Sequence, residues 1–335
     1  VYIPPGAYNL KGRLTVPQYV ELRGGHDAGV YDRPQTVLCS YADKDQPSKP
    51  AFITLEADAG VSGFCVYRPE QTWNALTGDT TLHEYPPAIR GTNRNWAYNI
   101  ATANCYDGID FSIGNNHHID VLYDCALGTS VKIRSDVGSV SVVDNIQTKN
   151  QAWRAARKWS LPPFKDHKLG DGAPNTDEQG NASDPVNYIG DYGRGVHAIG
   201  DGEFRFMGHF NNDCGDDNAY AKGSPKLNAY LCGGEGNGVG MHLDSDDGKA
   251  FDVELVCSSY HTYGDAYTKS VTDTSNSGDI LQLFACKQYG FAPIMHNVTG
   301  SGHLIAQMDW QNKSLDSFIV LEDTATAVIE SGIYS

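Results

Sequence analysis

The sequence lacks long apolar stretches and has almost no helical pattern. No window approaches the ~20 consecutive apolar residues of a membrane-spanning helix, so we expect no membrane insertion. Residues 151–159 are the one segment that could form a helical turn or two. The chain has instead many short runs rich in valine and isoleucine, with 36 glycines among them. Such runs, bounded by glycine, are typical of β-strands.

Basic residues are in the minority. The chain has 25 Lys and Arg against 41 Asp and Glu, which gives a formal net charge of −16 at pH 7. Nucleic acids and anionic membranes require an attractive basic surface, so we expect neither as a partner. The negative net charge also disfavours a densely anionic polysaccharide as a partner, unless a local basic cleft overrides the global charge.

The eight cysteines lack the spacing of a zinc site. None stands in a CxxC pair or in a Cys/His set with structural zinc spacing. Most are separated by roughly one structural repeat, as Cys105 and Cys125 are, or Cys232 and Cys257. We expect buried cysteines at equivalent positions of neighbouring repeats. Disulfides, which an exported protein permits, are the alternative.

Short alternating runs recur along the whole chain, for example at residues 51–55, 130–134 and 251–255. Their spacing of about 8–12 residues also suits a β-sandwich. Weak self-similarity at about 20–25 residues favours a stack of coils instead. Because a solenoid can grow as one domain past the usual globular limit, we expect residues 1–335 to form a single domain.

The start of the chain carries the clearest motif. Residues 1–8 read VYIPPGAY and residues 14–25 read LTVPQYVELRGG. This pair of sequence segments resembles the first coil of right-handed parallel β-helix proteins of the pectate-lyase-like superfamily. The resemblance implies an all-β fold, a single-stranded right-handed parallel β-helix with long loop insertions. It also implies a secreted or cell-surface protein that acts on carbohydrate.

Two segments interrupt the repeat, at about residues 68–88 and 150–195. Loops of this length in a compact domain are usually functional or disordered. We expect them to wall a substrate groove or to contact a neighbouring subunit, with Trp153 and Trp159 as residues that stack on sugar rings. Decoration without function is the alternative.

Four titratable residues near position 250 suggest a catalytic centre. In an alternating strand Asp252 and Glu254 point outward together, roughly 6.6 Å apart along the strand. That value is close to the ~6.5–9.5 Å carboxyl separation of inverting glycosidases. His242 and Asp244 face outward in the preceding run by the same logic. We predict Asp252 and Glu254 as the catalytic pair, with His242 and Asp244 assisting; a solvated acidic face is the alternative.

The four groups share one patch if their two runs belong to successive coils. Like charges at that distance raise the pKa of one carboxyl, as a general acid requires. No cofactor is required by this chemistry. Asp244, Asp246 and Asp247 leave calcium open, although the spacing is not that of an EF-hand.

A second set lies upstream. His118 and Asp120 should face outward on one strand, and Lys132 and Arg134 on a following one. We predict all four as substrate-binding residues. β-Helix polysaccharide lyases use a Lys or Arg base, so Lys132 and Arg134 could also serve that chemistry. The alternative is simple ion pairing with Asp110 and Asp120.

Three functions follow from these patterns. The leading prediction is an extracellular glycoside hydrolase, or a related glycan-cleaving transferase, whose partner is a polysaccharide or oligosaccharide. The second is a polysaccharide lyase that acts by β-elimination on a uronate polymer. The third is a non-catalytic glycan-binding, adhesin or fibre-type β-helix. A homotrimer is an open possibility for the assembly.

Overall fold

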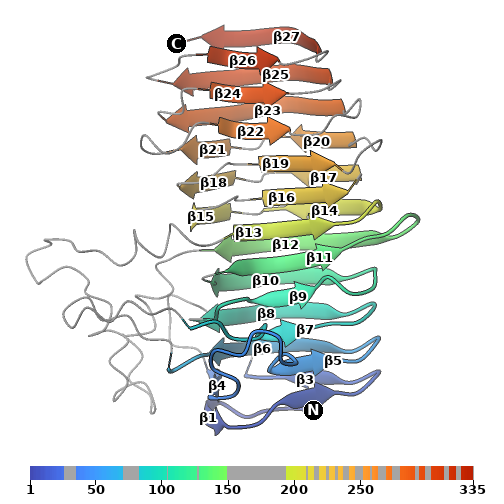
Figure 1. The fold of residues 1–335 in the computed structure, drawn as a ribbon, viewed down its shortest axis with the longest axis vertical. Helices are drawn as coiled ribbons and strands as arrows, with labels where there is room; N and C mark the ends of the chain where they lie inside the picture. Colours follow the sequence, from blue (N-terminus) through green and yellow to red (C-terminus); the bar gives the residue numbers. More distant parts are fainter. Residues whose placement is uncertain are drawn as a thin grey trace, which may run out of the picture.

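The computed structural model folds the chain as a stack of parallel coils (Figure 1). It describes residues 1–25, 35–70, 83–103, 105–126, 128–148 and 194–208, and after these the backbones of the strands between 210 and 334, with side chains at only a few of those positions. Throughout these ranges the regular structure is β-strand. No helix long and apolar enough to cross a membrane occurs in them.

One strand of each coil joins an 11-stranded parallel sheet. Its members are β2 (Leu14–Val16), β5 (Ile53–Leu55), β7 (Ile89–Arg90), β9 (Ile109–Phe111), β11 (Thr129–Arg134), β13 (Arg194–Ile199), β16 (Ala219–Gly223), β19 (Met241–Ser245), β22 (Lys269–Asp273), β24 (Ile294–Val298) and β26 (Ser317–Leu321).

The remaining strands form a 16-stranded parallel sheet. They are β1 (Gly6–Leu10), β3 (Glu21–Arg23), β4 (Thr36–Ser40), β6 (Gly60–Tyr67), β8 (Trp96–Ala103), β10 (His118–Cys125), β12 (Val140–Thr148), β14 (Glu203–Met207), β15 (Phe210–Cys214), β17 (Lys226–Tyr230), β18 (Gly233–Gly236), β20 (Asp252–Val256), β21 (Ser259–Thr262), β23 (Ile280–Gly290), β25 (His303–Asn312) and β27 (Thr326–Tyr334).

The coil length agrees with the repeat found in the sequence. Residues 22 positions apart meet in neighbouring coils, as the hydrogen bonds of Asn115 with Asn93 and of Thr129 with Asp107 show. The expected period of about 20–25 residues is therefore confirmed for these coils, whereas the first coils are longer, since Leu14 pairs with Ile53 and Ile53 with Ile89. That residues 1–335 form one domain stays a prediction.

Each of the strands β6, β8, β10 and β12 bends at one residue in the left-handed conformation. The first half of β12 pairs with β14 and its second half with β15, so the bend separates two sides of the coil. The strand of the 11-stranded sheet supplies the other side. Register stacks the bend residues of successive strands, which are Gly63, Asn99, Val121, Asn145 and Gly208, with φ values of 71°, 51°, 55°, 52° and 63°.

The core lies inside the coils and consists of aligned aliphatic and aromatic columns. A column here means the residues that register aligns across neighbouring strands of one sheet. In the 11-stranded sheet one inner column is Ile53, Ile89, Ile109, Val131 and Val196, each at most 1% exposed. The expected alternation of buried and outward residues is seen in β5 and at the end of β11, whereas β4 and β9 are buried at every position.

The three cysteines with described side chains, Cys39, Cys65 and Cys105, are buried and free. Their burial confirms that part of the expectation. They do not share one column, since Cys65 aligns with Val37 and Ala101 instead of another cysteine. The positions of these thiols therefore reflect burial in the core and not stacking on one another. Burial raises the pKa of both Cys39 and Cys105 to about 12.

The two predicted insertions lie largely outside the described residues, and so do Trp153, Trp159 and the expected helical segment 151–159. Their positions in the topology are nevertheless defined. The first stands between β6 and β7, and the second between β12 and β13. Each therefore connects the 16-stranded sheet to the next strand of the 11-stranded sheet.

Candidate functional site

Strand register regroups the residues that the sequence singled out. His242 and Asp244 lie in β19 of the 11-stranded sheet, whereas Asp252 and Glu254 lie in β20 of the 16-stranded sheet. The two runs are therefore not stacked neighbours, and the expectation of one patch of four groups is wrong. The reason is that β19 and β20, which follow one another in the same coil, belong to different sheets, while stacking joins strands one coil apart.

The upstream set is divided in the same way. His118 and Asp120 lie in β10 of the 16-stranded sheet, and Lys132 and Arg134 in β11 of the 11-stranded sheet. Register places Glu254 in the same column as His118, through Asn228, Arg205 and Val142 of the strands between.

In the 11-stranded sheet, register aligns Lys132 and Arg134 with the downstream residues His242 and Asp244. Lys132 shares a column with His197 and, through Tyr220, with His242. Arg134 occupies the column that leads through Lys222 to Asp244. The side chains of His242, Asp244, Asp252 and Glu254 and the residues Asp246 and Asp247 lie outside the described parts of the structure, so their predicted roles, and calcium at this turn, stay predictions.

Both upstream cations are held in ion pairs. The Lys132 Nζ lies 2.8 Å from Asp107 Oδ2, and the Arg134 Nε lies 2.9 Å from Asp136 Oδ1. These partners differ from the expected Asp110 and Asp120. Because each side chain is already held by a carboxylate, the lyase chemistry proposed for them is disfavoured.

Asp110 is paired with a different cation. Arg90 donates to Asp110 Oδ2 from Nε and from its terminal nitrogen, at 3.0 and 2.7 Å. Burial raises the pKa of Asp110, but the hydrogen bonds from Ser112 and Arg90 outweigh burial and hold that pKa below its usual range. Asp110 is therefore a structural carboxylate and not a proton donor.

The outer face of the 16-stranded sheet carries a different kind of group. Tyr98 of β8, His118 and Asp120 of β10, and Asp144 of β12 lie on adjacent strands; we call these four residues the outer cluster. Tyr98, Asp120 and Asp144 occupy one column, so their Cα atoms follow one another at the ~4.8 Å spacing of paired strands. Their inward neighbours Ala97, Ile119 and Val143 are buried, which places the cluster on the outside.

His118 links the two ends of the outer cluster. The Tyr98 hydroxyl lies 3.1 Å from His118 Nδ1, and the two rings meet edge to face at 5.1 Å. When the hydroxyl donates to Nδ1, the neutral ring carries its proton on Nε2. That nitrogen lies 3.5 Å from Asp144 Oδ2, an ion-pair distance that is long for a hydrogen bond.

The two carboxylates of the cluster have different surroundings. Asn145 Nδ2 donates to Asp120 Oδ1 at 2.8 Å, which fixes that carboxylate. Burial raises the pKa of Asp144; His118 opposes the shift, and the negative charge of Asp120 adds to it. Asp144 therefore keeps its proton to a higher pH than an ordinary aspartate, while its neighbour Asp120 is held by an amide donor.

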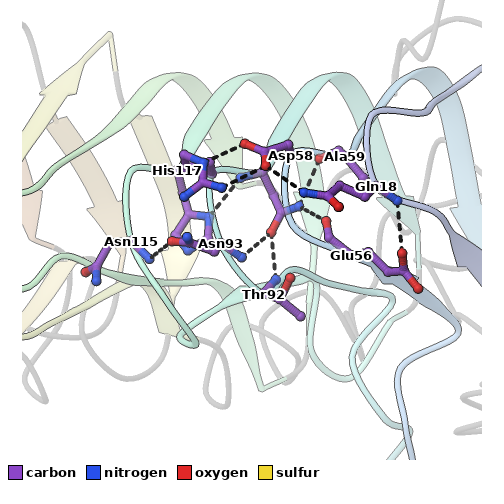
Figure 2. Close-up of polar contacts among 10 residues, drawn as sticks. Gln18, Glu56, Asp58, Ala59, Thr92, Asn93, Asn115 and His117 are labelled. Atoms are coloured by element: carbon purple, nitrogen blue, oxygen red, sulfur yellow. Dashed lines mark hydrogen bonds and ion pairs between the residues drawn. The ribbon is translucent and has the colours of Figure 1, made fainter.

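Polar side chains at the turns form a ladder that joins neighbouring coils (Figure 2). Gln18 donates from its backbone to Glu56 at 3.0 Å and from its side chain to Asp58 at 3.2 Å. One coil further, the Asn115 backbone donates to Asn93 Oδ1 at 3.0 Å. These side chains satisfy turn backbone groups and have a structural role.

His117 belongs to that ladder and not to the outer cluster. Its ring is 1% exposed and packs against Phe111. Nδ1 accepts the Asn95 backbone N–H at 3.3 Å, and Nε2 lies 3.0 Å from the Ile113 carbonyl, to which it donates. Burial lowers the pKa of His117 to about 4, so the ring stays neutral. Of the tandem histidines, only His118 reaches the outer surface.

No metal centre emerges from the described part of the chain. There, no three His, Cys, Asp or Glu side chains gather closely enough to hold a metal ion.

The sequence reasoning missed Tyr98 and Asp144. Asp144 directly follows the run 140–143, in which Val140 and Val142 take the outward positions and hide the alternation. Tyr98 stands between Ala97 and the bend residue Asn99, so its run is also short. A signal was present in the spacing, because Tyr98, Asp120 and Asp144 are separated by about one coil, the period of stacked repeats.

Comparison with known proteins gives similarity in structure alone. No protein-family model matches the sequence, and no curated protein matches it. The catalytic domain of a GH87 α-1,3-glucanase in complex with tetrasaccharides matches 100% of this chain with a TM-score of 0.55 at 9% sequence identity. The chain spans 64% of that domain's length.

Two further solved structures match less well. A polygalacturonase from Erwinia carotovora ssp. carotovora has a TM-score of 0.43 at 12% identity over 98% of this chain and 87% of its own. The Streptococcus pneumoniae surface protein and adhesin PfbA has a TM-score of 0.35 at 12% identity over 99% and 90%. The match to the glucanase, together with the parallel sheets, confirms the predicted right-handed parallel β-helix.

Proposed function

We propose that the protein is a glycan-cleaving enzyme, a glycoside hydrolase or related transferase, and that Asp144 is its proton donor. One observation carries this proposal. Asp144 is a carboxyl group whose pKa is raised, and it lies beside a second carboxylate on an outer face. Hydrolysis of a glycosidic bond uses one carboxyl group as the proton donor and a second, close to it, as base or nucleophile.

In the proposed reaction Asp144 gives its proton to the glycosidic oxygen as the C–O bond breaks. Asp120 acts on the other side of the anomeric carbon, either as nucleophile or as the base that takes a proton from water. Water supplies the hydroxyl that replaces the leaving group, so the products are two shorter saccharides. His118, held by Tyr98, orients the Asp144 carboxyl and acts as a positioning residue.

The fold supports a carbohydrate substrate. The glucanase that shares it was solved with tetrasaccharides bound, and parallel β-helices present long outer faces on which a chain can lie. Because such polymers are found outside cells, we also propose an extracellular place of action. Fold alone does not select a reaction, so the proposal depends on the outer cluster.

Asp252 and Glu254, with His242 and Asp244, remain a second proposal for the catalytic groups. Glu254 lies in the His118 column, so the sequence-derived pair and the outer cluster share the 16-stranded sheet. The two assignments make different predictions for single substitutions, and one assay separates them.

The test is release of reducing ends from neutral glucans, α-1,3-glucan among them, and from uronate polymers. Asp144→Asn and Asp120→Asn should each lower kcat/KM by 10²-fold or more, since general acid–base groups contribute about 10²–10⁴-fold. Asp45→Asn, a surface carboxylate paired with His83, is the matched control and should keep full activity.

The pH profile provides an independent readout. The acid form of Asp144 exists below its pKa, so the rate should fall as the pH rises through that raised pKa. Asp144→Asn should remove this basic limb. Full activity of Asp144→Asn together with loss in Asp252→Asn or Glu254→Gln would move the assignment to the second pair. An ultraviolet-absorbing unsaturated uronate product would establish the lyase, and inactivity across the panel with binding retained would establish a non-catalytic binder.

A further inference from the structure

Trp96 lies face down on the outer surface beside the outer cluster. It begins β8 and aligns with Gly60 on one side and with His118 on the other. A Cβ atom built on Gly60 would lie 2.1, 2.2 and 2.3 Å from Cε2, Nε1 and Cδ2 of the Trp96 ring. Three nearly equal distances to atoms of one ring place its face, and not its edge, over the glycine.

The other face of this indole points away from the sheet. Trp96 is half-buried, and its neighbour in the strand, Ala97, is 1% exposed and points into the core. The position of the indole therefore requires glycine at position 60, because any larger residue there would displace the ring. Tyr98, 36% exposed, follows on the same outer face about 6.6 Å further along the strand.

Three acidic groups lie near this aromatic surface. Asp120 and Glu21 both lie close enough to Tyr98 to raise its pKa, in addition to the effect of burial. Asp144 lies one strand beyond Asp120 in the same column. A polyuronate chain laid along the surface would meet like charges, whereas an uncharged sugar would not.

We propose that Trp96 is the stacking platform for a sugar ring next to the Asp144 proton donor, and that the glycan bound there is neutral. The inference rests on the proposed function and names its substrate class. A flat, half-buried indole with one face turned away from the sheet offers a large rigid apolar face to the C–H face of a pyranose. The hydroxyl of Tyr98 and the carboxylates of the cluster supply the hydrogen-bonding groups that orient a bound sugar.

The test measures binding in the Asp144→Asn background, so that the ligand is not consumed. The probes are neutral gluco-oligosaccharides, including α-1,3-linked ones, and an oligogalacturonate of equal length, titrated by calorimetry. Trp96→Ala should weaken binding of the neutral probe at least tenfold. Trp96→Phe keeps an aromatic face and should bind within about threefold of the parent.

Gly60→Ala tests the geometry without touching the indole. It adds the one atom that collides with the ring and should weaken binding as Trp96→Ala does, with circular dichroism confirming that the coil is intact. Tyr19→Ala removes an aromatic ring that is 78% exposed on a turn outside the cluster and should bind like the parent.

Unchanged affinity in Trp96→Ala, tighter binding of the oligogalacturonate, or no binding of any neutral probe would overturn the platform. Full hydrolytic activity of Asp144→Asn would overturn the proton-donor assignment instead. The two proposals therefore fail in different assays.

Discussion

Among the residues that the structure describes, Val121 has the backbone conformation that suits its side chain least. It has a φ of 55°, in the left-handed region that β-branched residues avoid. The residues stacked with it at the bends of neighbouring strands, Asn99 and Asn145, are of a type that tolerates this conformation. A left-handed non-glycine residue costs of order 1–3 kcal/mol, so Val121 stores strain directly beside Asp120.

Replacing Val121 should therefore stabilise the protein. We expect Val121→Asn to raise the free energy of unfolding by about 1 kcal/mol, since asparagine adopts this conformation at lower cost. Urea denaturation followed by circular dichroism measures the change. Val137→Asn, at a turn position that is 81% exposed, is the control and should change stability by less than about 0.5 kcal/mol. A lower stability of Val121→Asn would show that the valine is not strained.

At the scale of elements, buried polar residues fix the turns that lead into the long strands. Register stacks Asn95, His117 and Ser141, each at most 1% exposed, at the same position of successive coils. The His117 backbone N–H donates to Ser141 Oγ at 3.2 Å, as the Asn95 N–H does to His117. Each rung satisfies a backbone donor that the core would otherwise leave unpaired.

His117, within this stack of Asn95, His117 and Ser141, makes stability depend on pH. The pKa of His117 is about 4 in the fold, against 6.5 for an ordinary histidine, so the unfolded chain binds the extra proton first. The stabilisation is complete above pH 6.5 and is lost as the pH falls towards about 4, by roughly 3 kcal/mol in all. Denaturation curves across this window measure it.

His117→Asn should flatten that part of the profile, because asparagine already serves at the stacked position 95 and does not titrate. His83→Asn, which alters the surface ion pair with Asp45, should retain the acid loss. An acid loss of equal size in His117→Asn and in the parent would contradict the assignment.

At the scale of the molecule, the described strands of each coil pair with strands of the coils before and after it. Strand pairing runs from one coil to the next through both sheets, as Figure 1 shows. The stability of such a solenoid is approximately a sum of coil terms and nearest-neighbour terms. Core substitutions should therefore couple between adjacent coils and add between distant ones.

Ile53, Ile89 and Val131 test this expectation, because they share one inner column. We expect Ile53→Ala and Ile89→Ala, in adjacent strands, to be non-additive by about 0.5 kcal/mol or more. Ile53→Ala and Val131→Ala, two strands further apart, should add within about 0.5 kcal/mol. Double-mutant cycles from urea denaturation give both numbers, and strong coupling of the distant pair would contradict the nearest-neighbour picture.

The sequence by itself determined the strands and their stacking. The alternation in residues such as 130–134 and the recurrence at about 20–25 residues come from neighbours along the chain and favour a stack of coils, while the right-handed parallel β-helix followed from the resemblance of residues 1–25. Burial of Cys39, Cys65 and Cys105, and the outward positions of His118 and Asp120, follow from the same local pattern.

Only the tertiary structure decided which outward residues are neighbours. It separated Asp244 from Asp252, paired Lys132 with Asp107, and joined Tyr98 and Asp144 through His118. Alternation fixes the face of a strand on which a side chain lies. Its neighbours across the sheet depend on how many residues each turn and loop uses, and that number varies from coil to coil. The raised pKa of the Asp144 carboxyl therefore arises from the stacking of neighbouring coils. No single run of the sequence predicts it.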